Sequence, residues 1–173
     1  NLKLPRYGLS RYISEKRQTE ASEVEMQILD NLSRAGARMM GFCRTNFFKR
    51  LDSSGVSFMI SLYRHILRNA IFLYAIENKL PLPIGEEGSL PDGYSEDNDE
   101  GSTLFDSSIE SSKKKVRGTI AFCDDHDEYI KLGEKYYKKI SAENRSNVSW
   151  ISSQFFTRTL KQTLKQDCDT LIA

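Results

Sequence analysis

Cysteine is scarce in this sequence, and no apolar run is long. The 173 residues include three cysteines, Cys43, Cys123 and Cys168, which are odd in number and widely spaced. That pattern argues against a disulfide framework and favours free thiols in a reducing compartment. The richest apolar run, residues 70–76, is closed by Glu77 and is far shorter than the roughly 18–20 residues of a membrane span. The N-terminus also lacks the apolar core of a signal peptide. We therefore expect a cytoplasmic protein with no membrane segment.

The motifs of common nucleotide-binding and hydrolytic sites are also missing. The sequence contains no GK(S/T) phosphate loop, no GxGxxG after a strand, no nucleophile elbow and no HExxH. Each of these motifs supplies the backbone cradle, nucleophile or metal-ligand pair that its chemistry requires. We therefore predict that this chain alone has no catalytic residue, hydrolyses no nucleotide and holds no cofactor.

One cluster of metal-ligating residue types remains, in FCDDHDEY at residues 122–129. Cys123 and His126 have a spacing that suits a metal pair, and acidic residues surround them. A structural zinc site needs four convergent ligands, however, and the other cysteines and the other histidine offer no second pair. Acids are also what the helix dipole favours at a helix N-terminus. We predict no metal site, and keep a metal-dependent hydrolase using Cys123, His126 and Asp127 as a remote alternative.

The net charge of +1 hides a strong asymmetry. Residues 86–112 hold nine acidic side chains and no basic one, so the rest of the chain carries 25 basic side chains against 15 acidic ones. An excess of ten positive charges suits a polyanion such as nucleic acid, and the acidic segment can screen that charge.

The apolar pattern favours an all-α fold, an irregular bundle of three to five helices with a long acidic linker. We interpret residues 1–18 as an extended basic segment, 19–80 as a first helical block, 81–115 as a flexible linker and 116–173 as a second helical block. Gly, Ser, Asp and Pro dominate the linker, as they do in loops and disordered segments. VRGTIAFC, which opens the second block, is compatible with a short strand. Because the chain begins at Asn1, we expect one domain cut from a longer protein.

The first helix is predicted from about Thr19, where Ser22 and Glu25 have the spacing of a capping box. Glycine lowers helix propensity by about 1 kcal/mol relative to alanine, so this helix is expected to end or bend near Gly36 and Gly41. Apolar residues at steps of three and four predict its core face: Ile28, Leu32, Ala35, Met39 and Phe42.

A second, strongly apolar helix is predicted over residues 55–79, after the break and cap that residues 52–54 offer. His65 on this helix has no recognisable carboxylate or nucleophile partner, which favours a structural or solvent-facing role over a catalytic one. One polar stripe runs along the helix, formed by Ser57, Ser61, Arg64 and Arg68 with His65 and Asn69 beside them.

Five basic residues are our candidates for contact with nucleic acid or with a neighbouring domain: Arg44, Lys49, Arg50, Arg64 and Arg68. Residues 44–76 contain only one acid, Asp52. Two interpretations stay open. The arginines pair with carboxylates inside a larger assembly, or they contact phosphates directly or line an interface with a domain that does so.

The second helical block has two apolar patterns of helical spacing, with Trp150 and Ile151 expected to anchor the turn between them. A cluster of two tyrosines and two lysines at residues 136–139 suits either stacking on a nucleic-acid strand or a solvated lysine edge. The patterned residues are Tyr129, Leu132, Tyr136 and Ile140, then Phe156, Leu160, Leu164 and Leu171, and the cluster is Tyr136, Tyr137, Lys138 and Lys139.

Several stretches together resemble a known family. LKLPRYGLSRYI at residues 2–13, the segment 28–85 and the segment 136–172 are similar to the helical insert between the two RecA-like lobes of bacterial Swi/Snf-like (superfamily 2) helicase-related ATPases. This chain departs from the pattern at Tyr63, where we would expect an acid before Arg64. The most specific part is the FKRLxSSxxxF core, here Phe48, Lys49, Arg50, Leu51, Ser53, Ser54 and Phe58.

The resemblance implies a parent enzyme that binds ATP and Mg²⁺ and moves along or remodels double-stranded DNA. Its ATP-binding and arginine-finger motifs would lie outside residues 1–173, and its partners would be the flanking RecA-like lobes of the same chain and duplex DNA. We therefore expect a non-catalytic helical inter-lobe domain that couples motor lobes to nucleic acid. The alternative is a helical protein–protein interaction adaptor with a regulatory acidic linker.

Overall fold

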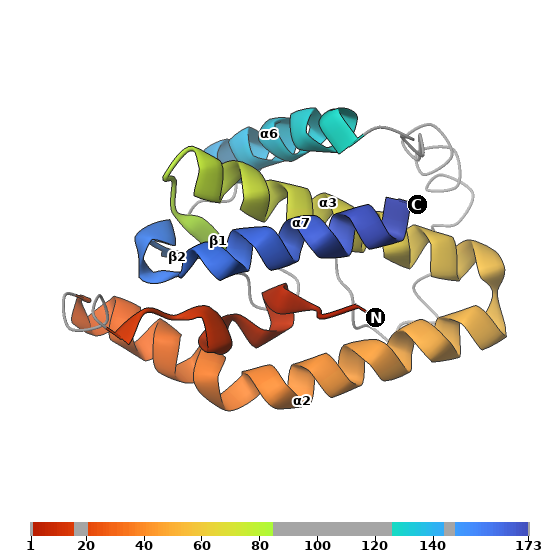
Figure 1. Ribbon diagram of the computed structural model, residues 1–173, viewed down its shortest axis with the longest axis horizontal. Coiled ribbons are helices and arrows are strands. Elements are labelled where there is room, and N and C mark those ends of the chain that lie inside the picture. The colour runs from red at the N-terminus through yellow and green to blue at the C-terminus, as the bar shows by residue number, and fades with distance from the viewer. Residues whose placement is uncertain (1, 16–20, 85–125, 144–147, 173) are drawn as a thin grey trace.

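The computed structural model describes residues 2–15, 21–84, 126–143 and 148–172. These residues form four α-helices, two short 3-10 helices and a two-stranded antiparallel sheet (Figure 1). The all-α fold class is confirmed. In chain order the elements are η1 (Pro5–Tyr12), α2 (Glu23–Ser53), α3 (Gly55–Glu77), β1 (Leu82–Ile84), α6 (His126–Glu143), β2 (Ser149–Ile151), η2 (Ser153–Phe155) and α7 (Arg158–Ile172).

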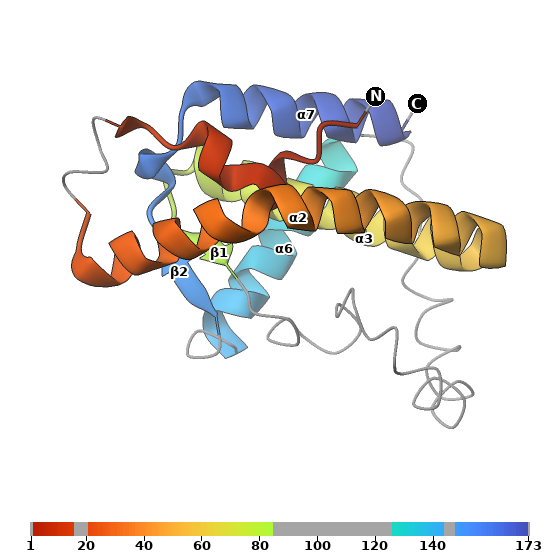
Figure 2. The same cartoon turned by 90° about the horizontal axis from the view of Figure 1, so that it is seen from below.

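Helix α3 is the central element and packs against α2, α6 and α7 (Figures 1 and 2). Residues 65–73 are all buried, so this half of the helix has a neighbour on every side. A helix that is apolar on most sides requires such an environment. Within the part of the chain that the structure describes, α3 included, no helix is long and apolar enough to cross a membrane.

A close helix contact lies where α6 crosses α3 at Gly133. A Cβ atom at Gly133 would lie 2.7 Å from the carbonyl carbon and oxygen of Ala70. Only glycine permits this distance. The buried positions of α6 are Tyr129, Gly133, Tyr137 and Ile140. Leu132 and Tyr136, the other residues of the predicted helical spacing, are half-buried and pack against the core.

Helix α2 begins where the sequence predicts. The Ser22 hydroxyl accepts the Glu25 N–H, and the Glu25 carboxylate accepts the Ser22 N–H at 3.1 Å, which completes the capping box. The helix then runs through Gly36 and Gly41 to Ser53. Of the two predicted alternatives, an end or a bend near these glycines, the end is wrong, because tertiary contacts outweigh their low helix propensity.

The predicted core face of α2 is confirmed in part, because Ile28 and Leu32 pack against the core. Its most deeply buried positions, however, are shifted by one residue. Leu29, Gly36 and Met40 are buried, whereas Phe42 is 45% exposed. The cause is η1, whose backbone lies directly on Gly36: a Cβ atom there would be 3.2 Å from the Tyr7 carbonyl oxygen. A glycine that receives a neighbouring backbone is invisible to a pattern of large apolar side chains. Of the other predicted positions, Ile28, Leu32 and Met39 are half-buried, and the side chain of Ala35 is outside the description.

The helix break predicted at residues 52–54 is confirmed. Helix α2 ends at Ser53, and the Ser54 hydroxyl accepts the Ser57 N–H to cap α3. The two helices form an antiparallel hairpin whose connected end extends past α6 and α7 in both views (Figures 1 and 2).

The sequence predicts an extended N-terminal segment, but in the structure this segment forms η1. Leu4, fully buried, turns the chain into η1 with left-handed dihedrals of φ 52° and ψ 53°, a conformation that costs energy for a residue with a Cβ atom. The Asp167 carboxylate of α7 accepts the Lys3 N–H at 3.0 Å and the Leu4 N–H at 2.7 Å. Hydrogen bonds to a charged acceptor are strong, so Asp167 anchors the N-terminal segment to α7.

The predicted linker starts later than residue 81. Leu82, Pro83 and Ile84 pair in antiparallel register with Ile151, Trp150 and Ser149. Trp150 and Ile151, expected in a turn, therefore lie in β2. The rest of the predicted linker, residues 85–115, and the possible strand at 116–123 lie outside the described residues.

Replacing Gly133 by alanine tests the crossing of α3 and α6. The added methyl group would overlap the Ala70 backbone, and overpacking costs about 1–3 kcal/mol. We expect Gly133→Ala to lower the free energy of unfolding, measured by urea denaturation. Gly41→Ala is the matched control, since nothing lies within 4 Å of its Cβ position, and it should raise stability by about 0.5–1 kcal/mol. Stabilisation by both substitutions would contradict the close crossing.

Replacing Asp167 by asparagine tests the N-terminal anchor. Each of the two N–H groups needs an acceptor, but the asparagine side chain has only one acceptor oxygen, and it is uncharged. We therefore expect the free energy of unfolding to fall by about 1–3 kcal/mol. Hydrogen exchange of the Lys3 and Leu4 amides should become faster. As a control, Asp30→Asn removes an exposed pair with Arg34, which is worth at most about 0.5 kcal/mol. Unchanged exchange at Lys3 and Leu4 would count against the anchor.

Candidate partner-binding surface

The five candidate bases do not form one continuous surface. Arg44 and Lys49 are exposed on α2, while Arg50 on α2 and Arg64 on α3 are half-buried. Arg68 is only 6% exposed, because α3 is packed on every side at that position. Arg68 therefore cannot contact a phosphate in this conformation, and the candidate set is reduced to four.

The polar stripe of α3 is mostly buried rather than solvated. Ser61, His65 and Asn69 are 9%, 0% and 0% exposed. The His65 ring stacks on Tyr7 with centroids 6.0 Å apart and meets the edge of Phe47 at 5.7 Å. Asn69 Nδ2 lies 3.4 Å from His65 Nε2. His65 is thus structural, as one interpretation held, and the solvent-facing interpretation is wrong.

A small pocket opens between η1, α2 and α3. Its volume is about 30 Å³, enough for one or two atoms of the size of a water molecule. Arg50 Nη1 donates to Ser61 Oγ at 3.0 Å, and Ser61 Oγ donates to the Ser57 carbonyl at 2.8 Å. The pocket is too small for a nucleotide or an organic cofactor. Its lining residues are Tyr7, Met39, Phe42, Cys43, Asn46, Phe47, Arg50, Ser61 and Arg64.

A wider depression of about 820 Å³ lies between η1 and the start of α2. It is lined by three acids, Glu15, Glu23 and Asp30, and one base, Arg11, among neutral side chains. Mixed charge over an open surface selects no particular ligand, so we assign no chemistry to this depression.

The connected end of the α2–α3 hairpin carries most of the exposed apolar side chains. Seven large apolar residues are exposed among those that the structure describes, and five of them fall within residues 42–59. Phe48 and Leu51 share a face of α2, as Val56 and Met59 share a face of α3. We call Phe48, Leu51, Val56 and Met59 the hairpin tip; they are 68%, 50%, 71% and 42% exposed. Exposed apolar clusters mark interaction surfaces more often than single exposed residues do.

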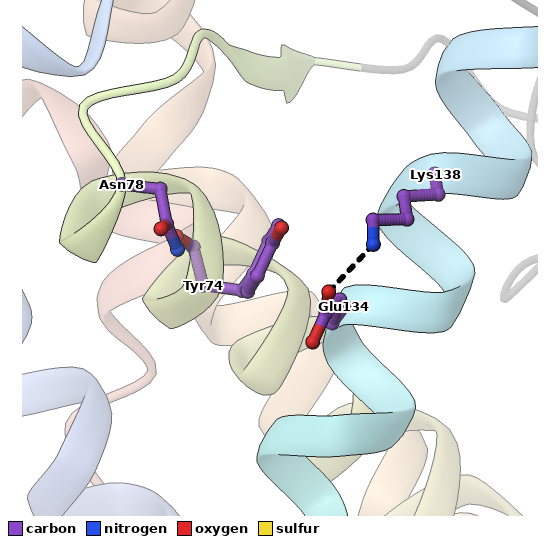
Figure 3. Close-up of polar contacts among 4 residues, drawn as sticks. All are labelled: Tyr74, Asn78, Glu134 and Lys138. Carbon is purple, nitrogen blue, oxygen red and sulfur yellow. Dashed lines mark hydrogen bonds and ion pairs between the residues drawn. The ribbon is translucent and has the colours of Figure 1, made fainter.

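The tyrosine and lysine cluster of α6 is divided between the core and the surface. Tyr137 is buried, and its hydroxyl donates to the Pro81 carbonyl at 2.9 Å. Lys138 instead points outward and pairs with Glu134 at 2.6 Å (Figure 3), and this hydrogen bond raises the pKa of Lys138. The stacking interpretation is therefore wrong for Tyr137, whereas Lys138 belongs to a solvated helix edge.

No group of three His, Cys, Asp or Glu side chains that could hold a metal ion occurs among the described residues. Cys123 lies outside them, and only the backbone of His126 is described. The metal-dependent alternative is thus left without a described ligand set.

Sequence reasoning missed Tyr7 and Asp167, which organise the surroundings of the pocket and the N-terminal segment. A signal for Asp167 was present, because it follows Leu160 by seven residues and Leu164 by three, which is core spacing on a helix. An acid at a core position has a buried partner. Tyr7 gave no comparable signal, because its contact with His65 depends on the path of η1.

Two of the cysteines lie in described parts of the chain, and both are free thiols. Cys43 is half-buried in the pocket lining, and Cys168 is buried on α7. Burial raises the pKa of the Cys168 thiol from its usual 9.0 to about 12, with a smaller opposing effect from a hydrogen bond to Asn69. Cys168 therefore stays protonated near neutral pH and acts as a small core residue.

The raised pKa of Cys168 predicts a pH-dependent stability. The unfolded chain loses the thiol proton near pH 9.0, but the folded protein keeps it up to about pH 12. The protonated thiol therefore makes its full contribution to the free energy of unfolding below pH 9. This contribution is lost as the pH rises from 9 to 12. Cys168→Ala should flatten the decline of unfolding free energy across this range, measured by urea denaturation. Cys43→Ala serves as the control and should leave a steeper decline. Identical slopes in the two variants would disprove the link between this decline and the Cys168 thiol.

No protein-family model, curated protein or solved structure matches this chain. The likeness to the Swi/Snf-like insert rests on the residues quoted for it, above all the FKRLxSSxxxF core. The role that this likeness implies is therefore a proposal.

Proposed function

We propose that this chain is a non-catalytic helical domain between the two RecA-like lobes of an ATP-dependent Swi/Snf-like DNA translocase. The family comes from the resemblance, and ATP with Mg²⁺ is bound by the lobes. The domain itself acts mechanically. It docks on a motor lobe and couples the movement of that lobe to duplex DNA.

The hairpin tip is the observation that carries this proposal. Phe48 and Val56 are 68% and 71% exposed, and they lie on the end of the hairpin that extends past α6 and α7 (Figure 2). A large apolar side chain gains roughly 1.5–3 kcal/mol when it moves from water into an apolar contact. Several such side chains at one projecting end favour a complementary protein surface.

Exposed positive charge accompanies the tip. Lys49 follows Phe48 directly, and Arg44 is one turn earlier on α2. An apolar centre with a charged or polar rim is the usual anatomy of a protein interface. This arrangement suits a lobe surface with an apolar centre and an acidic rim, and any base left outside that contact suits DNA phosphates.

The same tip also favours a second candidate, a helical protein–protein adaptor that belongs to no motor. In that case the apolar contact is with another protein, and the bases have no role on DNA. Salt separates the two functions, because binding to phosphates weakens steeply as salt rises, whereas an apolar contact does not.

Aspartate substitutions at the tip test the docking surface. In the protein that joins these residues to the motor lobes, Phe48→Asp or Val56→Asp places a charge in the apolar contact. Burying an unpaired charge is costly, and a loss of only about 1.4 kcal/mol is tenfold in binding. We expect DNA-stimulated ATP hydrolysis to fall by at least about tenfold, and the 173-residue chain alone to hydrolyse no ATP.

The matched control for the tip is Val24→Asp. Val24 is also 68% exposed but lies at the opposite end of α2, so its change should leave hydrolysis within about twofold of the unsubstituted protein. ATP hydrolysis by the 173-residue chain alone, or equal loss in tip and control variants, would refute the proposed function.

A further inference from the structure

Exposed basic side chains form one row along α6 and a second row along α7. At about 100° per residue, the three members of each row fall within about 60° of one another around the helix axis, so each row lies on one face of its helix. All six side chains are exposed. We call the two rows together the basic face: Lys131, Lys135 and Lys138 on α6, with Arg158, Lys161 and Lys165 on α7.

Helix α6 runs in the same direction as α3, which brings its row to the C-terminal half of α3. The Tyr129 ring lies 6.3 Å from the Tyr63 ring. Further along both helices, the Tyr137 ring lies 5.6 Å from the Tyr74 ring. Lys138, the last member of the α6 row, follows Tyr137 directly and lies next to this contact (Figure 3).

Helix α7 runs in the opposite direction to α3, so its first half reaches the same end of α3. Cys168 is hydrogen bonded to Asn69 in the middle of α3, whereas Lys161 pairs with Glu77 in the last turn of α3 at 3.1 Å. Both rows therefore lie towards the C-terminal end of α3. The hairpin tip is at the other end of this helix, because Val56 lies in its first turn.

Most of the charge on the basic face is not balanced by acids. Glu134 pairs with Lys138 at 2.6 Å, and Glu77 pairs with Lys161. Within the described ranges, the side chains of the other four bases make no hydrogen bond or ion pair, so a surplus of four positive charges remains. The other acids whose side chains the structure describes on these two helices lie towards the opposite end of α3: Asp127, Glu128, Asp167 and Asp169.

The basic face also lacks the apolar centre that a protein interface needs. Seven large apolar side chains are exposed among the described residues, and none of them is on α6 or α7. A typical protein interface has an apolar core with aromatic anchors. Binding to a phosphate backbone needs only positive charge at the right spacing, so nucleic acid suits this face better than a protein does.

The spacing of the two rows suits a duplex. Successive members of a row are three or four residues apart, which is one helical turn of about 5.4 Å, and long flexible side chains adapt this spacing to one line of phosphates. Helices in contact lie about 8–10 Å apart, and α6 and α7 both pack on α3, so the two rows are between about 8 and 20 Å apart. This range includes the major groove, which is about 12 Å wide and has a phosphate strand on each side.

We propose that the basic face binds the phosphate backbone of duplex DNA, with the α6 row on one strand and the α7 row on the other. This inference deepens the proposed function and rests on it for the identity of the polyanion. It assigns the two contacts of the domain to opposite ends, since the hairpin tip docks on a motor lobe and the basic face holds the duplex.

The test uses the 173-residue chain and a short labelled duplex, with binding followed by fluorescence anisotropy between about 50 and 200 mM salt. Lys135→Gln with Lys165→Gln removes one charge from each row. We expect this double variant to bind at least about tenfold more weakly at the lowest salt, and the slope of log affinity against log salt to fall by about two, one for each phosphate contact.

The matched control is Arg11→Gln with Arg34→Gln. It also removes two exposed charges, but from η1 and α2, so the affinity should stay within about twofold and the slope should not change. Lys135→Arg with Lys165→Arg keeps both charges and should also bind within about twofold of the unsubstituted chain. Thermal unfolding identifies any variant that fails to fold, and Lys131→Gln with Arg158→Gln then replaces the first double variant.

Poly-glutamate at an equal concentration of negative charge tests the other class of partner, an acidic protein segment such as residues 86–112 of this chain. It should displace the duplex far less well than unlabelled duplex does. Equal displacement would overturn DNA as the partner, and equal weakening by the row and control variants would overturn the basic face.

Failure of the basic face is distinguishable from failure of the proposed function. Duplex binding that ignores both row variants would overturn the basic face and leave the proposed function intact. Weaker duplex binding by the row variants, together with unchanged ATP hydrolysis after the aspartate substitutions at the hairpin tip, would keep the basic face and refute the proposed docking.

Discussion

The rest of the structure depends on the place where α6 crosses α3. Gly133 lets the backbones approach until a Cβ atom would be 2.7 Å from Ala70, and this seats α6 on the apolar helix at the centre. With α2 and α7 on its other sides, α3 can bury residues 65–73 completely. The charged and polar groups of that stretch are then almost fully shielded from solvent. The depth of this packing separates buried Arg68 from half-buried Arg64 on the same helix.

The burial of α3 gives its two arginines, Arg64 and Arg68, different roles. They lie one turn apart in sequence but in different environments, since Arg68 is inside the packed half and Arg64 is at its edge. At that edge η1 and α2 leave a small opening, and there Arg64 lies with Arg50 in the lining. The stripe is thus part core and part rim, so its two arginines cannot share one role as phosphate contacts.

The sequence predicted those features that local chemistry determines. The Ser22 capping box, the break before α3 and the all-α class depend on residues close together in the chain. The sequence could not predict that η1 would lie on Gly36, that Asp167 would bind two N-terminal amides, or that Gly133 would be a contact. These features pair residues far apart in the chain through backbone groups or the absence of a side chain, and periodicity records only large apolar side chains. Among the candidate bases, spacing grouped Arg64 with Arg68 correctly on one stripe, but burial separated them.

The hairpin is also stiff in a way that suits coupling. Helices α2 and α3 are joined through the single non-helical residue Ser54, which caps α3, so there is no flexible loop at which the tip could pivot. Phe47 and Phe58 contact each other across the pair, and the other end of the hairpin is held by α6, α7 and η1. An α-helix of 31 residues is about 46 Å long at 1.5 Å per residue. The proposed inter-lobe role would require a displacement at the tip to be carried along these helices to the core, and this arrangement suits it.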